Sequence, residues 1–150
     1  MKKIIGKSIA ILAISVISLS FSSTFGGEGF QISLNGKVLL EQYGKDMDAV
    51  KNLELSKASP NDKITIRYYH CGRIGKGRVV TVKDINDKTV KEWRYRDPNA
   101  PVSDMSCSVQ DFLGLKKKSN ILKLYYSSSE LPDGRQLATV ILGGSSIVQP

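Results

Sequence analysis

The chain of 150 residues carries 22 basic and 14 acidic side chains, a formal net charge of +8, and 41% of its residues are hydrophobic. This length suits one domain with a single core. The mild positive charge is spread along the chain and argues against a nucleic-acid-binding protein, which needs a concentrated basic face.

The first segment is typical of a secretory signal peptide. Lys2, Lys3 and Lys7 make its start positive, and Ser8 to Phe21 is an apolar stretch shorter than the roughly 20 residues that span a bilayer. We therefore expect residues 1–26 to be a signal peptide, with an uncleaved N-terminal anchor as the alternative. The candidate cleavage positions are small or polar: Ser22, Ser23, Thr24 and Gly27.

Export would change the charge and the setting of the remaining domain, residues 27–150. Without its signal the chain keeps 19 basic and 14 acidic side chains, a net charge of +5. No later stretch is long and apolar, so we expect no stable membrane insertion after cleavage. The expected location is the periplasm or the extracellular space.

The body of the chain reads as short strands. Phe30–Leu34 and Lys37–Gln42 flank Asn35-Gly36, a strong signal for a two-residue β-hairpin. Six further stretches are rich in Val, Ile, Thr and Tyr: Val50–Leu55, Lys63–His70, Arg78–Lys83, Thr89–Tyr95, Ile121–Tyr126 and Gln136–Leu142. Turn sequences separate most of them, at 59–62, 85–88, 97–99 and 131–134.

This pattern predicts an all-β, single-domain antiparallel β-sandwich of about eight strands. Its architecture is immunoglobulin-like, but the family is not, because Cys71 and Cys107 lie only 36 positions apart and Met105 stands where those domains place a tyrosine. Helical spacing predicts at most one short helix, near 109–115, while Gly44 to Ala49 reads as a loop or one helical turn. The end near 143–150 is expected to be flexible.

The two cysteines are expected to pair. An oxidising compartment favours a Cys71–Cys107 disulfide in a small exported domain. Strict alternation along the strand opposes it, since Cys71 would face away from the core side that carries His70. A bulge or the end of the strand near Gly72 would resolve this conflict.

The segment from His70 to Arg78, HCGRIGKGR, raises four possibilities. One is a redox centre, which is disfavoured because Cys71 lacks the neighbouring second cysteine that thioredoxin-like exchange uses. A second is a soft-metal site for copper or zinc, with His70, Cys71, Cys107, Met105 and Met47 as weak candidate ligands. Alternation separates His70 from Cys71, which disfavours this site. Another is an anion site formed by Arg73, Lys76 and Arg78, although no helix follows the glycines to support a phosphate. The favoured interpretation is a glycine-bent, cationic hairpin turn.

Catalysis has little support in the sequence. A serine nucleophile would have His70 as its only imidazole base, and no pair of carboxylates stands out by spacing. We therefore expect a non-enzymatic protein without a cofactor, and a small hydrolase is the weakest alternative.

Binding remains as the expected function. The protein is predicted to be a binding or accessory module for a protein or for a glycan of the cell envelope, with a soft-metal-binding protein as the alternative. Candidate surface residues are Arg67, Tyr69 and the outward-pointing member of the adjacent pair Tyr125 and Tyr126. The ligand and the oligomeric state are left open.

Overall fold

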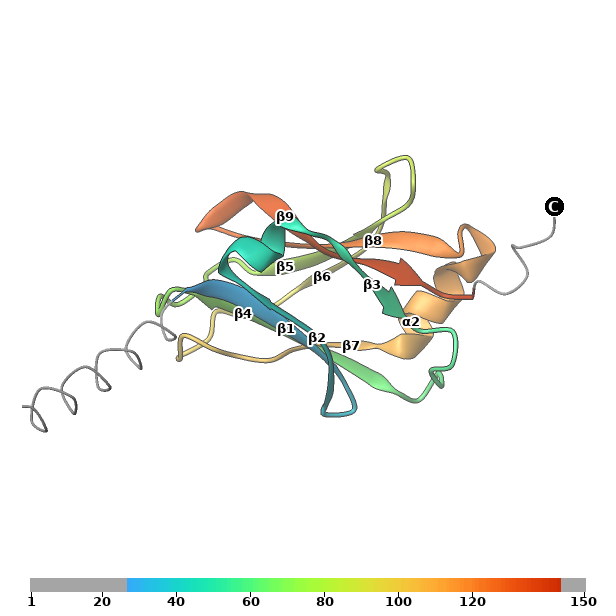
Figure 1. Ribbon diagram of the computed structural model, residues 1–150, viewed down its shortest axis with the longest axis horizontal. Coiled ribbons are helices and arrows are strands. Elements are labelled where there is room, and N and C mark those ends of the chain that lie inside the picture. Colours follow the sequence, from blue (N-terminus) through green and yellow to red (C-terminus); the bar gives the residue numbers. More distant parts are fainter. Residues whose placement is uncertain (1–26, 144–150) are drawn as a thin grey trace, which may run out of the picture.

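The computed structural model describes residues 27–143, which form two β-sheets packed face to face (Figure 1). The strands are β1 (Glu28–Leu34), β2 (Lys37–Tyr43), β3 (Lys51–Glu54), β4 (Lys63–His70), β5 (Val79–Lys83), β6 (Thr89–Arg94), β7 (Met105–Ser108), β8 (Ile121–Ser128) and β9 (Leu131–Ile141). One sheet has the order β2-β1-β4-β7 and the other β3-β9-β8-β5-β6. The predicted signal peptide and the predicted flexible end beyond residue 143 lie outside the described residues.

The predicted all-β sandwich is confirmed, with nine strands in place of about eight. The additional strand is β7, whose sequence Met-Ser-Cys-Ser alternates buried and exposed positions but is only 4 residues long. A strand so short, with serine at every second position, gives no propensity signal strong enough to separate it from a loop.

Alternation along the strands builds the core. In β4 every second side chain is buried, from Ile64 to His70, and β8 repeats the pattern from Leu122 to Ser128. Because successive side chains on a strand point to opposite faces, each strand gives one row to the core and one to solvent. The largest fully buried side chains include Phe30, Phe112 and Tyr126, contributed by both sheets and the helix.

The short helices close the ends of the sandwich. The predicted helix near 109–115 is α2 (Val109–Leu113) followed by the 3-10 turn η2 (Gly114–Lys117), and Ser108 caps α2 by accepting a hydrogen bond from the Gln110 amide. Phe112 enters the core against Trp93, with ring centroids 5.3 Å apart. A second 3-10 turn, η1 (Gly44–Asp48), follows β2. Between residues 27 and 143, no helix has the length and hydropathy needed to cross a membrane.

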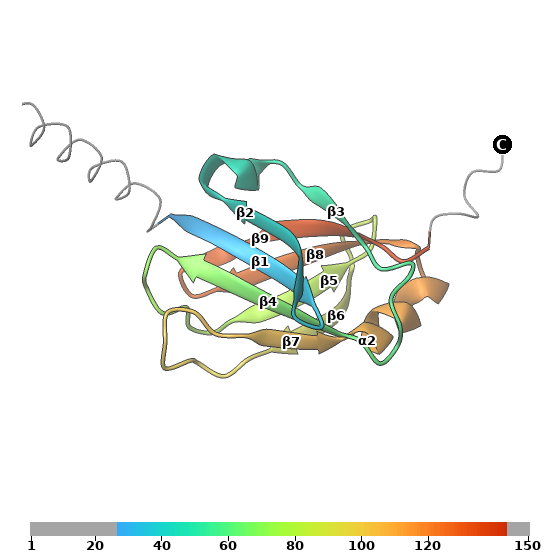
Figure 2. The same ribbon diagram turned by 60° about the horizontal axis from the view of Figure 1, so that its bottom comes forward.

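The segment 71–78 is not the predicted hairpin. It connects β4 of one sheet to β5 of the other, and Figures 1 and 2 show it at the end of the sandwich opposite α2. Both edges of β4 are taken, by β1 and by β7, so β5 cannot pair with β4 and joins β6 and β8 instead. Whether β4 and β5 form a hairpin therefore depends on which strands already pair with β4, and not on the sequence between β4 and β5.

Two further expectations are corrected. The sheet is not wholly antiparallel, because β3 pairs with β9 in parallel. The predicted turn at 131–134 lies inside β9, and the hairpin turns instead at Ser129 and Glu130. Gly134 has a positive φ of +75°, as expected for a turn residue. It lies within β9, at a point where the pairing of β8 with β9 is irregular.

The β1–β2 hairpin forms at Asn35-Gly36 as predicted, both with positive φ. Its register is irregular, because Ile32 pairs with Leu40 whereas Ser33 pairs with Val38. Leu39 is therefore an extra residue in β2, the outermost strand of its sheet.

The predicted disulfide between Cys71 and Cys107 is wrong in this structure, where both thiols are free. Cys107 pairs across the sheet with Ile64, near the start of β4, whereas Cys71 follows the last residue of that strand. Seven residues of extended chain separate the two positions by about 23 Å, far beyond the roughly 6 Å between the Cα atoms of a disulfide.

The two thiols should differ sharply in reactivity. Cys71 is exposed, whereas Cys107 is buried and burial raises its pKa to about 11. We expect a thiol-alkylating reagent to modify Cys71 in the native protein without any reductant, and Cys107 only after unfolding. Mass spectrometry of the wild type and of Cys71→Ser measures this. If neither thiol reacted in unfolded protein that had not been reduced, the Cys71–Cys107 disulfide would be supported after all.

Candidate functional site

A hollow of about 640 Å³ lies on the outer face of the sheet β2-β1-β4-β7, the sheet turned toward the viewer in Figure 2. We call it the outer hollow. Its lining is polar except for Val38 and Gly36, and comprises Gln31, Ser33, Asn35, Gly36, Val38, Lys63, Thr65, Arg67 and Asp104.

Strand register arranges this face in three rows. Read from β2 through β1 to β4, they are Tyr43, Gly29 and Tyr69; Glu41, Gln31 and Arg67; and Val38, Ser33 and Thr65. Neighbouring side chains in one row lie close enough for direct contact. The first row is not part of the lining of the outer hollow but lies next to the second row, and the second and third rows contribute to that lining.

The first row is an aromatic pair laid over a glycine. The rings of Tyr43 and Tyr69 lie 5.8 Å apart between centroids, and a Cβ at Gly29 would overlap the Tyr43 ring. Glycine at this position therefore allows two tyrosines from β2 and β4 to approach across β1. Burial and the neighbouring Tyr69 raise the pKa of Tyr43 to about 12, so its hydroxyl stays protonated at neutral pH.

The second row is held by bonds within the protein. The Gln31 amide donates to Glu41 at 3.0 Å, and the Arg67 Nε donates to Asp104 at 2.5 Å. Asp104, through hydrogen bonding and charge, raises the pKa of Arg67. These side chains are exposed, so the ion pair adds little stability, but the bonds fix the direction in which each group points.

The third row offers hydroxyl groups. Ser33 and Thr65 pair between β1 and β4, and both line the outer hollow, where Ser33 is buried with 9% of its surface exposed and Thr65 is half-buried. The hairpin tip beside them is fixed, because Asn35 donates to the Asp62 carboxylate at 2.8 Å and accepts from the Lys63 amide at 2.9 Å. The outer hollow thus combines a rigid frame with hydroxyl groups in its lining.

Of the predicted surface residues, Arg67 and Tyr69 lie on this face. Tyr126 is fully buried, and Tyr125 is the outward member of its pair, as alternation requires. Tyr125, however, belongs to the other sheet, so it lies on the opposite outer face from Arg67 and Tyr69. The expectation of one surface formed by all three residues is therefore wrong.

The predicted cationic anion site does not assemble. Arg73 and Lys76 are exposed, but Arg78 is buried and donates to the carbonyl oxygens of Ser103 at 3.2 Å and Arg96 at 2.9 Å. It ties down the loop between β6 and β7. The three cations therefore do not converge on one point.

The backbone amides of the same loop are also occupied. The Lys76 amide donates to Glu130 at 3.0 Å, and the Gly77 amide donates to Asp97 at 2.8 Å. Carboxylates of the protein thus sit where a phosphate would have to bind.

His70 lies in a buried polar cluster that joins the two sheets. Its Nε2 is 2.8 Å from the Tyr126 hydroxyl and 3.5 Å from Ser128 Oγ, and the Tyr68 ring stacks on Tyr126 with centroids 4.3 Å apart. A Cβ at Gly75 would come within 2.8 Å of the His70 ring. Two strands and a glycine of the 71–78 loop therefore enclose this histidine.

Burial, above all, lowers the pKa of His70. The carboxylates of Glu130 and Glu28 oppose this shift, while Arg73 and Arg78 add to it. The imidazole is therefore neutral at physiological pH and serves as a hydrogen-bonding group of the core.

The candidate metal ligands are dispersed. Met105 pairs with Ile66, four residues from His70 along β4, a separation of about 13 Å. Cys107 lies farther along β7, and Cys71 is exposed beyond the end of β4. Within residues 27–143 no group of three or more His, Cys, Asp or Glu side chains is placed to hold a metal ion.

Most residues of the outer hollow could not be predicted from the sequence alone. Its rows depend on β1 lying beside β4, a pairing that no local pattern encodes. One signal was available: Gly29 at the start of a strand is typical of a close approach by another group. The hairpin register at Asn35-Gly36 also relates β1 to β2 and could have placed Gly29 opposite Tyr43.

No protein-family model matches this chain, and no curated protein matches it.

The pKa shift of His70 predicts a pH-dependent stability. Its folded-state pKa lies below the ordinary 6.5, so below about pH 6.5 the unfolded chain binds a proton that the folded chain resists. Stability should therefore fall as pH drops from about 7.5 to 5, by at most about 1.4 kcal/mol per pH unit from this group. Urea unfolding of the wild type and of His70→Gln measures the difference between their slopes.

Tyr126→Phe is the matched control, because it removes the hydroxyl partner but keeps the titrating histidine. We expect it to lower stability and to retain the pH dependence. Equal slopes for the wild type and His70→Gln would contradict the assignment to His70.

Gly29→Ala tests the aromatic pair. Replacing a strand glycine by alanine ordinarily stabilises a protein, but here the new Cβ meets Tyr43 and the Gln42 carbonyl oxygen, so we expect a loss of about 1 kcal/mol. In a protein that already carries Tyr43→Ala, one of the two clashes is absent. Gly29→Ala should therefore lower the free energy of unfolding less in that background than in the wild type. Urea unfolding of the four proteins gives the coupling, and a stabilising effect of Gly29→Ala alone would contradict the close approach.

Proposed function

We propose that this protein is an exported, non-enzymatic binding module that recognises another macromolecule through the outer face of the sheet β2-β1-β4-β7. The observation that carries the proposal is the outer hollow, which Ser33 and Thr65 help to line, together with the tyrosine pair two rows away on the same face, beyond Gln31 and Arg67. Concave polar surfaces with an aromatic border are suited to holding a ligand in one orientation.

Rigidity of the frame supports this role. Glu41 holds Gln31, Asp104 holds Arg67, and Asp62 holds Asn35, so three of the lining side chains are oriented before any ligand arrives. Binding groups that are already ordered lose less conformational entropy on association. The outer hollow therefore has a property expected of a binding site.

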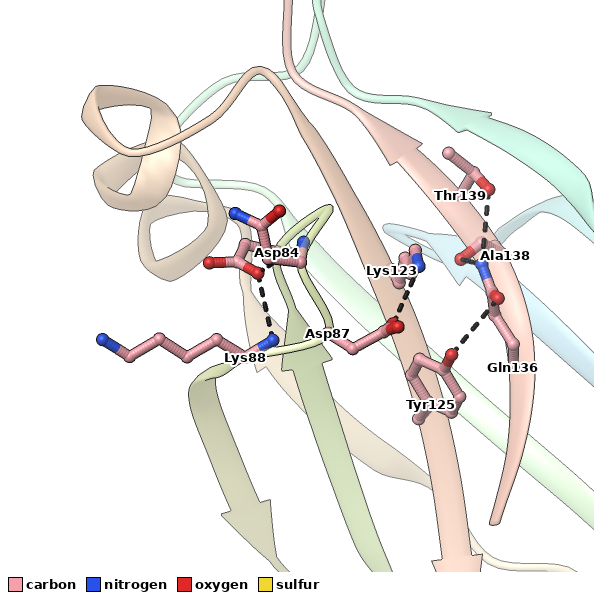
Figure 3. Close-up of polar contacts among 9 residues, drawn as sticks. Asp84, Asp87, Lys88, Lys123, Tyr125, Gln136, Ala138 and Thr139 are labelled. Atoms are coloured by element: carbon pink, nitrogen blue, oxygen red, sulfur yellow. Dashed lines mark hydrogen bonds and ion pairs between the residues drawn. The ribbon is translucent and has the colours of Figure 1, made fainter.

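The opposite outer face differs. Figure 3 shows its polar groups bonded to one another: Lys123 to Asp87 at 2.7 Å, and Tyr125 to Gln136 at 3.4 Å. The ammonium of Lys83 lies 4.4 Å from the centre of the Tyr125 ring and covers it. This face supplies matched control positions for the proposed site.

Export is the second element of the proposal. It is supported by the positive start and the apolar stretch from Ser8 to Phe21, followed by small residues. An exported module would meet proteins and glycans of the envelope or of the surroundings.

Site-specific photocrosslinking in the cells that produce the protein tests the binding face. A photoreactive residue replaces Thr65 in the outer hollow or, as control, Thr81, which pairs with Tyr125 on the opposite outer face. Both threonines are half-buried positions on central strands. We expect a high-mass adduct from position 65 and none from position 81.

Two results would contradict the proposal. Adducts of equal yield from both positions would mean nonspecific contact, and their absence from position 65 in a folded, exported protein would mean that no macromolecule occupies the outer hollow. Recovery of the adduct in the envelope or extracellular fraction tests export at the same time.

A further inference from the structure

We infer that the ligand of the outer hollow is an uncharged glycan chain that runs along β4, with a sugar ring on the tyrosine pair and sugar hydroxyls on the polar rows. This inference rests on the proposed binding role of the face. It is carried by three properties of the described side chains: their charge balance, their open hydrogen-bonding groups and the place of the aromatic rings.

Charges around the outer hollow balance. Lys63 and Arg67 lie along β4, while Asp104 lines the same hollow and Glu41 stands in the same row as Gln31 and Arg67. A polyanion would meet the two carboxylates, and a polycation would meet the two basic groups. Because the site carries both positive and negative groups, neither a polyanion nor a polycation gains binding energy from a surface potential of the opposite sign. An uncharged polymer therefore fits the site best.

The pairing of these charges leaves donors and acceptors free. The Arg67 guanidinium has five N–H donors, of which Nε donates to Asp104 and another group interacts with the Tyr69 hydroxyl, so further donors remain. The Gln31 amide keeps its carbonyl oxygen after donating to Glu41. The hydroxyls of Ser33 and Thr65 each donate and accept. Sugar hydroxyls also do both, so adjacent groups of a glycan would find partners of either kind.

The tyrosine pair lies beside this polar surface. Tyr43 is 42% exposed and packs against Tyr69, in the row next to Gln31 and Arg67. The C–H face of a sugar ring is apolar and packs on an aromatic ring, while its hydroxyls point outward to polar neighbours. From Tyr69 to Lys63 the outward side chains of β4 mark a path of about 20 Å, long enough for several sugar units.

A protein partner fits this surface less well. The centres of protein interfaces are depleted in charge and enriched in apolar and aromatic groups. In the outer hollow, the one lining side chain with only apolar atoms is Val38, and the other lining side chains carry hydroxyl, amide or charged groups. The composition therefore favours a hydrated, polyhydroxylated ligand.

Affinity electrophoresis of the purified protein tests the inference. The gels contain a panel of neutral polysaccharides (β-glucans, mannan, xylan and galactan) or one of a matched pair, polygalacturonate and its methyl ester. The pair shares its sugars and differs in charge. We expect at least one neutral polymer to slow the protein, with little change when salt is raised, and polygalacturonate to bind no better than its ester.

Variants assign the binding to the outer hollow. Tyr69→Ala and Thr65→Val should each weaken retention about tenfold, the effect of losing one stacking or hydrogen-bonding contact. Tyr125→Ala and Thr81→Val, their counterparts on the opposite sheet, should bind like the wild type. Thermal unfolding of each variant confirms that it is folded.

The outcomes separate this inference from the proposed function. Stronger binding to polygalacturonate that falls with salt would overturn the uncharged ligand and leave the face in place. A protein in the adduct at position 65, with no polysaccharide retained, would overturn the glycan. Equal weakening by the variants on both faces would overturn the outer hollow as the site, and the absence of any adduct at position 65 would overturn the proposed function itself.

Discussion

The ladder between β1 and β4 is the constraint on which both the core and the proposed site depend. It pairs seven residues of each strand without interruption, from Glu28 opposite His70 to Leu34 opposite Ile64. Because side chains alternate, this single register sends Ile64, Ile66, Tyr68 and His70 inward and Lys63, Thr65, Arg67 and Tyr69 outward. A slip of one residue would expose the hydrophobic row and bury the charged one, so the hydrophobic effect that stabilises the sandwich also fixes the geometry of its outer face.

Polar groups inside the sandwich connect distant parts of the chain. His70 and Tyr126 link the two sheets, and Tyr68 donates a hydrogen bond to Glu28 at the first residue of β1. Arg78 secures the loop between β6 and β7 through two carbonyl oxygens. Buried polar groups left without partners are costly, so these contacts select one arrangement of loops and strands over alternatives that an apolar core alone would tolerate.

How much of the fold and of the candidate site the sequence predicts depends on whether each feature is set by neighbouring residues or by contacts between distant parts of the chain. Alternation and turn residues are local, so they gave the sandwich class, the short helix and the bounds of β4, which match residue for residue. The segment 71–78 and the pairing of cysteines depend on which strand lies beside β4, and local patterns carry no such information. The inward direction of Arg78 was missed for a related reason: charged residues near turns are usually solvated, and here a loop from a distant part of the chain supplies the carbonyl partners. In the candidate site, Arg67 and Tyr69 were reachable from alternation, whereas Ser33, Gln31 and Asp104 needed the three-dimensional neighbours.

The irregular pairing at Leu39 affects how readily β2 can pair with a strand of another molecule. β2 is one of the two edge strands of the sheet that carries the outer hollow, and unprotected edge strands can pair with strands of other molecules and start fibrils. The extra residue interrupts the regular spacing of backbone donors and acceptors that an incoming strand would have to match. The protein would thereby keep its polar face open to a ligand while remaining a poor template for polymerisation of its own copies.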